Sequence, residues 1–232
     1  MPRLAILISG AGSNMRALIE AQRRAAIEAE IALVLSDRAA AGLQIAKEFA
    51  IESGCVPASK TIPREEHDAA VMRELRKLRI DFVILAGYMR ILSTSFVEAW
   101  SGRMLNIHPS LLPRHKGLHT HRRALEAGDT EHGSTVHFVT PDLDGGPPVV
   151  QAKFAIRAED TEHSLHARVQ TCEHLIYPEA VAWLSSGRLQ WRAGEPWLDE
   201  QRLQQPVERF FSDQFFGNPD PGTPWQASEH AV

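Results

Sequence analysis

The sequence contains only two cysteines, Cys55 and Cys172, and they lie far apart in the chain. It also has no apolar run that approaches the length of a membrane span. Its first apolar run, 4–8, is too short for a secretory signal and is followed by a glycine loop. These absences favour a reduced, cytoplasmic protein over a disulfide-bonded secreted protein or a membrane protein.

The chain also lacks an excess of positive charge. Its formal net charge is −4, which gives no general attraction to nucleic acid or to an anionic membrane. Any anionic ligand must therefore be held by a local site. Hydrophobic residues at 44% and charged residues at 23% are typical of a soluble globular protein, and 232 residues can form a substantial core.

Short apolar runs alternate with segments of helical periodicity through the first half of the chain. The runs are 4–8, 31–35 and 82–85, and the helical segments are 14–28, 42–51 and 65–78. Continuous apolar runs are typical of strands buried on both faces. The alternation predicts an α/β fold with a mostly parallel twisted sheet, a Rossmann-like arrangement with helices on both faces. We expect a further central strand at 103–108 and an antiparallel addition within 135–156.

A long helix is predicted from about residue 160 to residue 183, with Thr161 as a good N-cap type. Pro178 should kink or interrupt this helix, because proline cannot donate a backbone hydrogen bond. The composition changes after Pro206. We therefore predict a catalytic domain over 1–205 and a proline- and aromatic-rich C-terminal tail over 206–232. The tail aromatics would pack on the body or on a partner, with a disordered end as the alternative; they are Phe210, Phe211, Phe215, Phe216 and Trp225.

A glycine loop at 9–14 separates the first strand from the first helix. Glycine lets the backbone approach a ligand, and a helix N-terminus offers unpaired N–H groups. The loop lacks the third glycine of a dinucleotide fingerprint and the Gly-Lys-Ser/Thr of a P-loop. The loop is therefore predicted to bind a single phosphate monoester. The alternative is a plain turn in which Ser13 caps the helix.

Asn106 and His108 stand two residues apart at the end of a predicted strand, directly before Pro109. Positions i and i+2 of a strand point to one face, so both side chains would enter one pocket. Asp144 lies in a tight glycine-proline loop and could orient the histidine. An amide donor, a proton shuttle and a carboxylate suit acyl transfer without a serine or cysteine nucleophile. The alternative is a satisfied histidine beside an unrelated turn.

Eleven histidines raise the question of a metal site. No Cys-x-x-Cys or His-Glu-x-x-His spacing occurs, and asparagine is a poor ligand for transition metals. We therefore expect no functional metal.

Seven segments together resemble phosphoribosylglycinamide formyltransferase, a folate-dependent formyltransferase family. They are Ile8–Asn14, Leu85–Leu92, Leu105–Pro113, Gly117–His121, Gly133–Val139, Leu143–Gly146 and Arg168–His174. The resemblance covers roughly residues 4 to 200 in order and spacing, and it leaves the segment after Pro206 outside. The departures are Ala11, the stretch 114–116 without an expected proline, the loop 141–143 and the doubled proline at 147–148.

The resemblance implies transfer of the formyl group of 10-formyltetrahydrofolate, as cosubstrate, to the amine of glycinamide ribonucleotide in purine biosynthesis. It places the catalytic residues at Asn106, His108 and Asp144. The ribonucleotide contacts implied are Gly12, Ser13, Asn14, Gln170 and Glu173. The folate contacts implied are Arg64, Met89, Arg90, Ile91, Leu92, Asn106, Val139, Thr140 and Asp144, with 139–144 closing over the pterin. His119, His121 and His137 would line or support the folate pocket.

The residue types suit direct transfer through a tetrahedral carbon. Asn106 can donate to the developing oxyanion, as can a charged His108, which also suits proton transfer near neutral pH. A carboxylate at Asp144 would favour the imidazolium.

The alternatives are a 10-formyltetrahydrofolate hydrolase, a methionyl-tRNA formyltransferase and a nucleotide-binding sensor module without turnover. A hydrolase usually carries an N-terminal regulatory domain, and the tRNA enzyme would need an RNA-binding domain and a basic surface. We expect small-molecule substrates, no nucleic-acid or membrane partner, and a possible homodimer.

Overall fold

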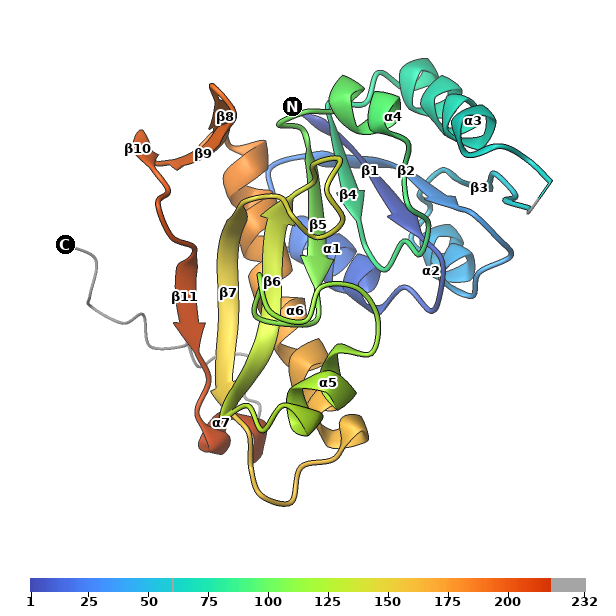
Figure 1. The fold of residues 1–232 in the computed structure, drawn as a ribbon. Coiled ribbons are helices and arrows are strands. Elements are labelled where there is room, and N and C mark those ends of the chain that lie inside the picture. The colour runs from blue at the N-terminus through green and yellow to red at the C-terminus, as the bar shows by residue number, and fades with distance from the viewer. Residues whose placement is uncertain (60, 218–232) are drawn as a thin grey trace.

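The computed structural model describes residues 1–59 and 61–217 (Figure 1). Its strands are β1 (Arg3–Ile8), β2 (Glu30–Ser36), β3 (Ser53–Cys55), β4 (Phe82–Leu85), β5 (Met104–His108), β6 (Glu131–Phe138), β7 (Pro148–Ala155), β8 (Leu189–Arg192), β9 (Glu195–Leu198), β10 (Gln201–Arg202) and β11 (Val207–Phe210). Its helices are α1 (Ser13–Arg23), α2 (Gly42–Glu48), α3 (Arg64–Lys77), α4 (Thr94–Ala99), α5 (Thr120–Glu126), α6 (Glu162–Ser185) and α7 (Asp213–Gly217). None of these helices combines the length and apolarity needed to cross a membrane.

Within the described residues the main sheet has eight strands in the order β11-β7-β6-β5-β4-β1-β2-β3. The five strands β3, β2, β1, β4 and β5, neighbours in that order, pair in parallel. β6 runs antiparallel to β5 and to β7, and β11 pairs in parallel with β7. The predicted fold class, including the antiparallel addition within 135–156, is confirmed.

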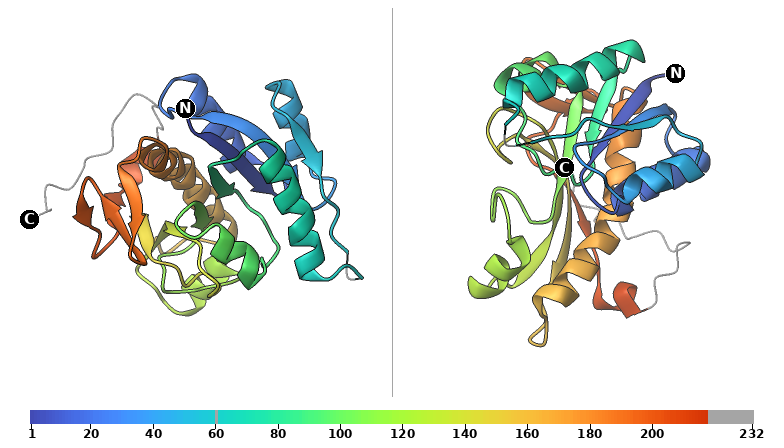
Figure 2. Two further views of the ribbon diagram at one scale, coloured as in Figure 1. Left: turned by 90° about the horizontal axis from the view of Figure 1, so that it is seen from above. Right: turned by 90° about the vertical axis from the view of Figure 1, so that its right-hand side faces the viewer.

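Helices cover both faces of the sheet (Figure 2). α1, α2 and α6 pack against one face, where Met15, Leu18 and Tyr177 are buried with the apolar side chains of β1 and β5. α3 and α4 pack against the other face, where Val71, Leu75 and Phe96 meet the alternate residues of the same strands. Both faces of β1 are therefore buried, which explains why its sequence is a continuous apolar run.

The long helix α6 begins after Thr161, whose side chain accepts a hydrogen bond from the Ser164 N–H in a capping box. It continues through Pro178 to Ser185, so the prediction that Pro178 interrupts it is wrong. The neighbouring Tyr177 is fully buried, and its hydroxyl donates to the carbonyl oxygen of Leu85 at 2.8 Å. Burial on both sides of the proline holds the helix together although one backbone hydrogen bond is lost.

The chain after α6 contains two features that the sequence did not indicate. β8, β9 and β10 form a small antiparallel sheet. β11, which lies in the segment predicted as a tail, continues the main sheet beside β7, and α7 follows it (Figure 1). Phe211, Phe215 and Phe216 of this segment contact one another. Trp225 lies outside the described residues.

Candidate active site

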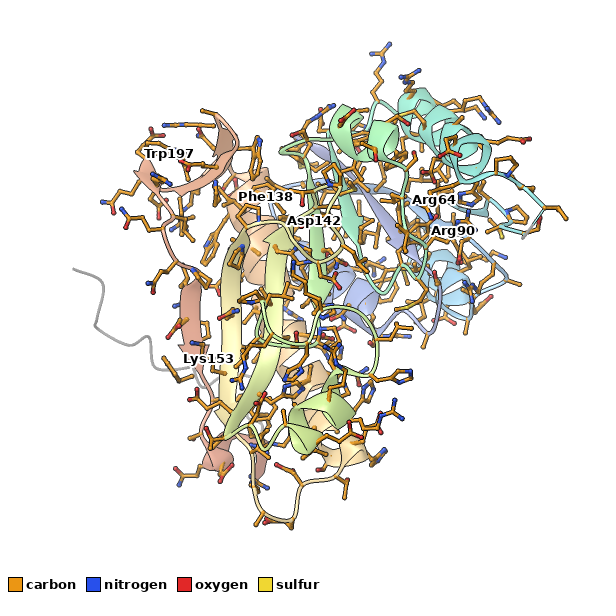
Figure 3. The ribbon with its side chains drawn as sticks, in the orientation of Figure 1. Arg64, Arg90, Phe138, Asp142, Lys153 and Trp197 are labelled. Carbon is orange, nitrogen blue, oxygen red and sulfur yellow. The ribbon has the colours of Figure 1, made fainter. Side chains whose placement is uncertain are left out.

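Asn106, His108 and Asp144 converge at the end of β5. Asn106 and His108 lie on one face of the strand, and Asp144 lies in the loop between β6 and β7, a loop marked by Asp142 in Figure 3. The Asp144 Oδ2 atom is 3.4 Å from the His108 Nδ1 atom, and both side chains are largely buried. Asp144 has a positive φ of 47°. The tight loop also requires Gly146, because a Cβ there would lie 1.8 Å from the carbonyl oxygen of Phe138.

Both ring nitrogens of His108 have partners. The Nε2 atom is 3.0 Å from the carbonyl oxygen of His115, which can only accept a hydrogen bond. The Nδ1 atom faces the carboxylate of Asp144. Both contacts are favourable at once when both nitrogens carry a proton. The Gly117 N–H also donates to Asp144 Oδ2, at 2.8 Å, so the backbone of the loop 109–119 fixes both members of the pair.

His137 fixes the orientation of the Asn106 amide. The two residues pair directly across β5 and β6, and the Asn106 Nδ2 atom donates to His137 Nε2 at 3.1 Å. His137 Nδ1–H donates to the carbonyl oxygen of Phe138 at 2.9 Å, which leaves Nε2 as the acceptor. Burial lowers the pKa of His137 to about 4, so the ring is neutral near pH 7. The sequence placed His137 near the folate but did not reveal this role.

The glycine loop and α6 meet beside these residues. Gly12 occupies the N-cap of α1 with a φ of 81° and no side-chain cap, so the alternative in which Ser13 caps the helix is wrong. The Gln170 Nε2 atom donates to Ser13 Oγ at 3.1 Å. The Asn14 Nδ2 atom donates to Glu173 Oε2 at 2.9 Å. The five residues predicted to contact the ribonucleotide are therefore together.

Glu173 is a buried carboxyl group at this junction. Only 8% of the residue is exposed. Burial raises its pKa to about 7, although the hydrogen bond from Asn14 opposes the shift. Protonation of Glu173 therefore changes near neutral pH, at a position where a ligand hydroxyl or ammonium group could contact it.

A pocket with an empty volume of about 550 Å³ opens on the other side of Asn106. It is lined by Leu85, Tyr88, Arg90, Ile91, Leu92, Val97, Asn106, His137 and residues 139–144. Seven of the nine residues predicted to contact folate are in this lining. Met89 and Arg64 are outside it: Met89 is 62% exposed, and Arg64 is an exposed residue at the start of α3 (Figure 3).

Two further buried histidines, His121 and His132, contact each other. The His121 Nδ1 and His132 Nε2 atoms lie 2.9 Å apart, and His166 contacts the His121 ring edge-on. His119 is the N-cap of α5, with a positive φ. In the part of the chain that the structure describes, no set of three histidine, cysteine or acidic side chains could hold a metal ion.

Three buried histidines lead us to expect an acid-sensitive fold. Burial lowers the pKa of His121 and His137 from 6.5 to about 4, and that of His132 to about 3. Between pH 6.5 and pH 4 these histidines are protonated in the unfolded chain but remain neutral in the folded protein. The stability that the neutral histidines contribute is therefore complete above pH 6.5 and is lost as the pH falls toward 4. We expect the free energy of unfolding to drop by up to about 1.4 kcal/mol per pH unit for each histidine in this window.

Urea titrations at several pH values between about 7.5 and 5 would measure this slope. Because carboxyl groups also contribute, His132→Gln is the matched comparison: it should remove about one third of the histidine contribution to the slope. The prediction would be contradicted if the free energy of unfolding depended on pH with the same slope in the wild type and in His132→Gln.

The comparisons with known proteins agree with this geometry. A model of the formyl transferase family matches residues 2–181. The chain belongs to this formyl transferase family. It is 47% identical over 212 residues to phosphoribosylglycinamide formyltransferase from Escherichia coli, which covers 91% of this chain and 99% of that protein. It is also 45% identical over 189 residues to the human trifunctional purine biosynthetic protein adenosine-3. That alignment covers 81% of this chain and 19% of that protein.

A solved structure from the same family has the same fold. Phosphoribosylglycinamide formyltransferase from Coxiella burnetii, in complex with CHES, superimposes with a TM-score of 0.84 and 41% sequence identity. The alignment covers 88% of this chain and 98% of that protein. The family suggested by the sequence motifs is therefore confirmed.

Proposed function

We propose that this chain transfers the formyl group of 10-formyltetrahydrofolate to the amine of glycinamide ribonucleotide, a step of purine biosynthesis. The observation that carries the proposal is the convergence of Asn106, His108 and Asp144 at the pocket that is also lined by 139–143. Relatives from Escherichia coli and Haemophilus influenzae, at 47% and 43% identity, carry the name of this activity.

In this proposal the amine attacks the formyl carbon directly. The charge that develops on the formyl oxygen is stabilised by the Asn106 amide, whose orientation His137 fixes. His108 in its charged form donates a second hydrogen bond to the formyl oxygen. When the tetrahedral carbon collapses, the bond between the formyl carbon and N10 of the folate breaks, His108 gives a proton to N10, and the proton that the attacking amine loses restores the charged ring. His108 Nε2 must leave the His115 carbonyl oxygen to take part in these steps, which requires a small movement of the loop 109–119. Asp144 keeps the imidazolium in place.

The ribonucleotide would lie against the glycine loop and α6. Its phosphate would accept hydrogen bonds from the backbone of Gly12, Ser13 and Asn14 at the start of α1. Gln170 and Glu173 would contact the ribose and the glycinamide. These contacts would place the amine toward His108.

Folate would occupy the pocket on the other side of Asn106. The backbone of 90–92 and the loop 139–144 would enclose the pterin. Arg64 and Met89, which lie outside the pocket lining, would contact the more exposed part of the molecule, with Arg64 near a glutamate carboxylate. The contact of Arg64 would be the most solvent-exposed of the proposed folate contacts.

A formyl-transfer assay tests the proposal. We expect loss of 10-formyltetrahydrofolate to require glycinamide ribonucleotide and to yield one formylated ribonucleotide for each folate consumed. Equal loss without the ribonucleotide would identify a hydrolase instead. Binding of the ribonucleotide without any turnover would identify a sensor module.

We expect Glu173→Gln to lower kcat/KM for the ribonucleotide more at pH 8 than at pH 6. Because the pKa of Glu173 is raised to about 7, the wild-type carboxyl is neutral below that pH and resembles glutamine. Above pH 7 the variant lacks a charged acceptor, and we expect a loss of about tenfold or more. Glu159→Gln, at an exposed position before α6, is the matched control. An equal loss at both pH values would contradict this role.

We also propose a cytoplasmic setting, a homodimer, and no nucleic-acid partner. Sedimentation across a range of protein concentrations would measure the oligomeric state. A single species with the 25.8 kDa mass of the chain would exclude the dimer.

A further inference from the structure

Arg168 on α6 is a buried arginine outside the reacting groups. Only 6% of the residue is exposed. Its Nη1 atom donates to Asp160 Oδ2 at 2.6 Å, and its Nη2 atom donates to the carbonyl oxygen of Ala155 at 2.9 Å. Arg168 therefore joins α6 to the end of β7 and to the loop that precedes the helix.

The C-terminal segment 207–217, which we call the clamp, completes the surroundings of Arg168. The Arg168 guanidinium contacts two rings that also meet edge-on, 4.2 Å from the centre of Phe154 on β7 and 4.6 Å from the centre of Phe216 on α7. Its Nη2 atom also donates to Asp213 Oδ1 at 3.2 Å. The clamp thus supplies one of the two aromatic rings that contact Arg168, and a second carboxylate.

β11 holds the clamp against the body. Its residues 207–210 pair with 150–153 of β7, and the Phe211 N–H donates to the carbonyl oxygen of Lys153 at 2.9 Å (Figure 3 labels Lys153). Phe211 is 5% exposed. The clamp is therefore built into the fold, and α7 lies near the start of α6 (Figure 1).

Pro178 removes one backbone hydrogen bond from α6, so the first half of the helix depends on its tertiary contacts, which include the buried side chains of Leu165 and Val169 as well as Arg168. Proline has no N–H, so the carbonyl of His174 loses its usual partner within the helix. The helix is weakened between its buried second half and the turns that carry Gln170 and Glu173. Those turns are held on one side by the contacts of Gln170 and Glu173 with Ser13 and Asn14. Arg168 and the clamp hold them on the other side.

We propose that Arg168 is a positioning residue for the ribonucleotide, and that the clamp sets its position. The cation–π stack with Phe216 and the ion pair with Asp213 keep residues 162–173 in register with the glycine loop. Gln170 and Glu173 are then already placed when the ribonucleotide arrives. This inference rests on the proposed function for its substrate, but its structural part does not.

Phe216→Ala in the full chain tests the inference, with Phe210→Ala as the matched control and Phe216→Tyr as the rescue. Phe210 belongs to the same segment, is 45% exposed and stacks with Lys153 instead. We expect Phe216→Ala to raise the KM for glycinamide ribonucleotide by about three- to tenfold, which lies between the effects of an exposed and of a desolvated cation–π contact. kcat and the KM for folate should stay within about twofold, because the reacting groups lie on β5 and the 139–144 loop. Phe216→Tyr should behave like the wild type.

Hydrogen exchange of the backbone amides is the second measurement, and it needs no substrate. We expect faster exchange over 162–173 in Phe216→Ala, with 179–185 unchanged. Unchanged exchange over 162–173, or an unchanged KM for the ribonucleotide, would overturn the inference. An equal change in the KM values for the ribonucleotide and for folate, with a proportional fall in kcat, would also overturn the inference, because that pattern indicates general unfolding. A wild-type protein without formyl transfer would instead disprove the proposed function, and the exchange data would still decide whether the clamp holds α6.

Discussion

Asp144→Asn is expected to lower kcat by about 10³-fold or more, an effect comparable to the loss of the orienting carboxylate in a serine protease triad. Asp144 Oδ2 faces Nδ1 of His108 at 3.4 Å and accepts the Gly117 N–H at 2.8 Å. Asparagine has the same shape but no charge to stabilise the imidazolium. Its amide group could also present hydrogens toward a protonated Nδ1, which would be repulsive.

Single-turnover formyl transfer measured against pH would separate this role from a loss of binding. We expect the pH dependence of the rate to change in Asp144→Asn, because the charge that faces His108 is gone. Glu131→Gln, an exposed carboxyl at the start of β6, is the control for charge alone. A pH–rate curve that keeps its wild-type shape in Asp144→Asn would remove Asp144 from this role.

The central strands of the fold could be predicted because burial on both faces leaves a strong local pattern. β1, β2, β4 and β5 are each continuous apolar runs or nearly so. β3 and β11 have no such pattern: Ser53–Cys55 is short and partly exposed, and Val207–Phe210 has two adjacent charged residues between its two apolar ones. They are the edge strands of the sheet, and the backbone of their single neighbour decides their structure.

Among the helices, too, the local sequence did not decide the structure of α5 or the effect of Pro178. Thr120–Glu126 is too short to have a clear amphipathic pattern, and its position depends on the loop before it. The effect of Pro178 could not be read locally, because burial of Tyr177 and its neighbours decides whether the helix continues. Tertiary contacts outweigh local preference in both cases.

That Asn106 and His108 enter one pocket could be predicted from their spacing, whereas the convergence of Asp144 on them was predicted from the family resemblance. The partners that complete the site could not be predicted. The carbonyl of His115 and the N–H of Gly117 are backbone groups, which nearly every residue in the loop also possesses. Only the conformation of the loop selects them. His137 was recognisable as a neighbour, but its bond to Asn106 depends on the register between β5 and β6.

Asn106→Asp is expected to lower kcat by about 10²- to 10³-fold, the range found when an oxyanion donor is removed elsewhere. The amide Nδ2 has two hydrogens. One is used by His137 Nε2 at 3.1 Å, and the other can reach the developing oxyanion. Aspartate has nearly the same volume, so packing is retained, but it offers no donor and places a negative charge beside the one that forms.

The carboxylate in Asn106→Asp would also face the lone pair of His137 Nε2, and this repulsion is relieved only if the ring takes up a proton. The pKa of His137, which burial lowers to about 4, should therefore rise in the variant, as NMR titration of its ring protons would measure. Gln201→Glu, the same chemical change on exposed β10, should leave both the rate and that titration unchanged. If folded Asn106→Asp transferred formyl groups within about threefold of the wild-type rate, oxyanion stabilisation by Asn106 would be excluded. The backbone of the closing loop would then have to supply the donor.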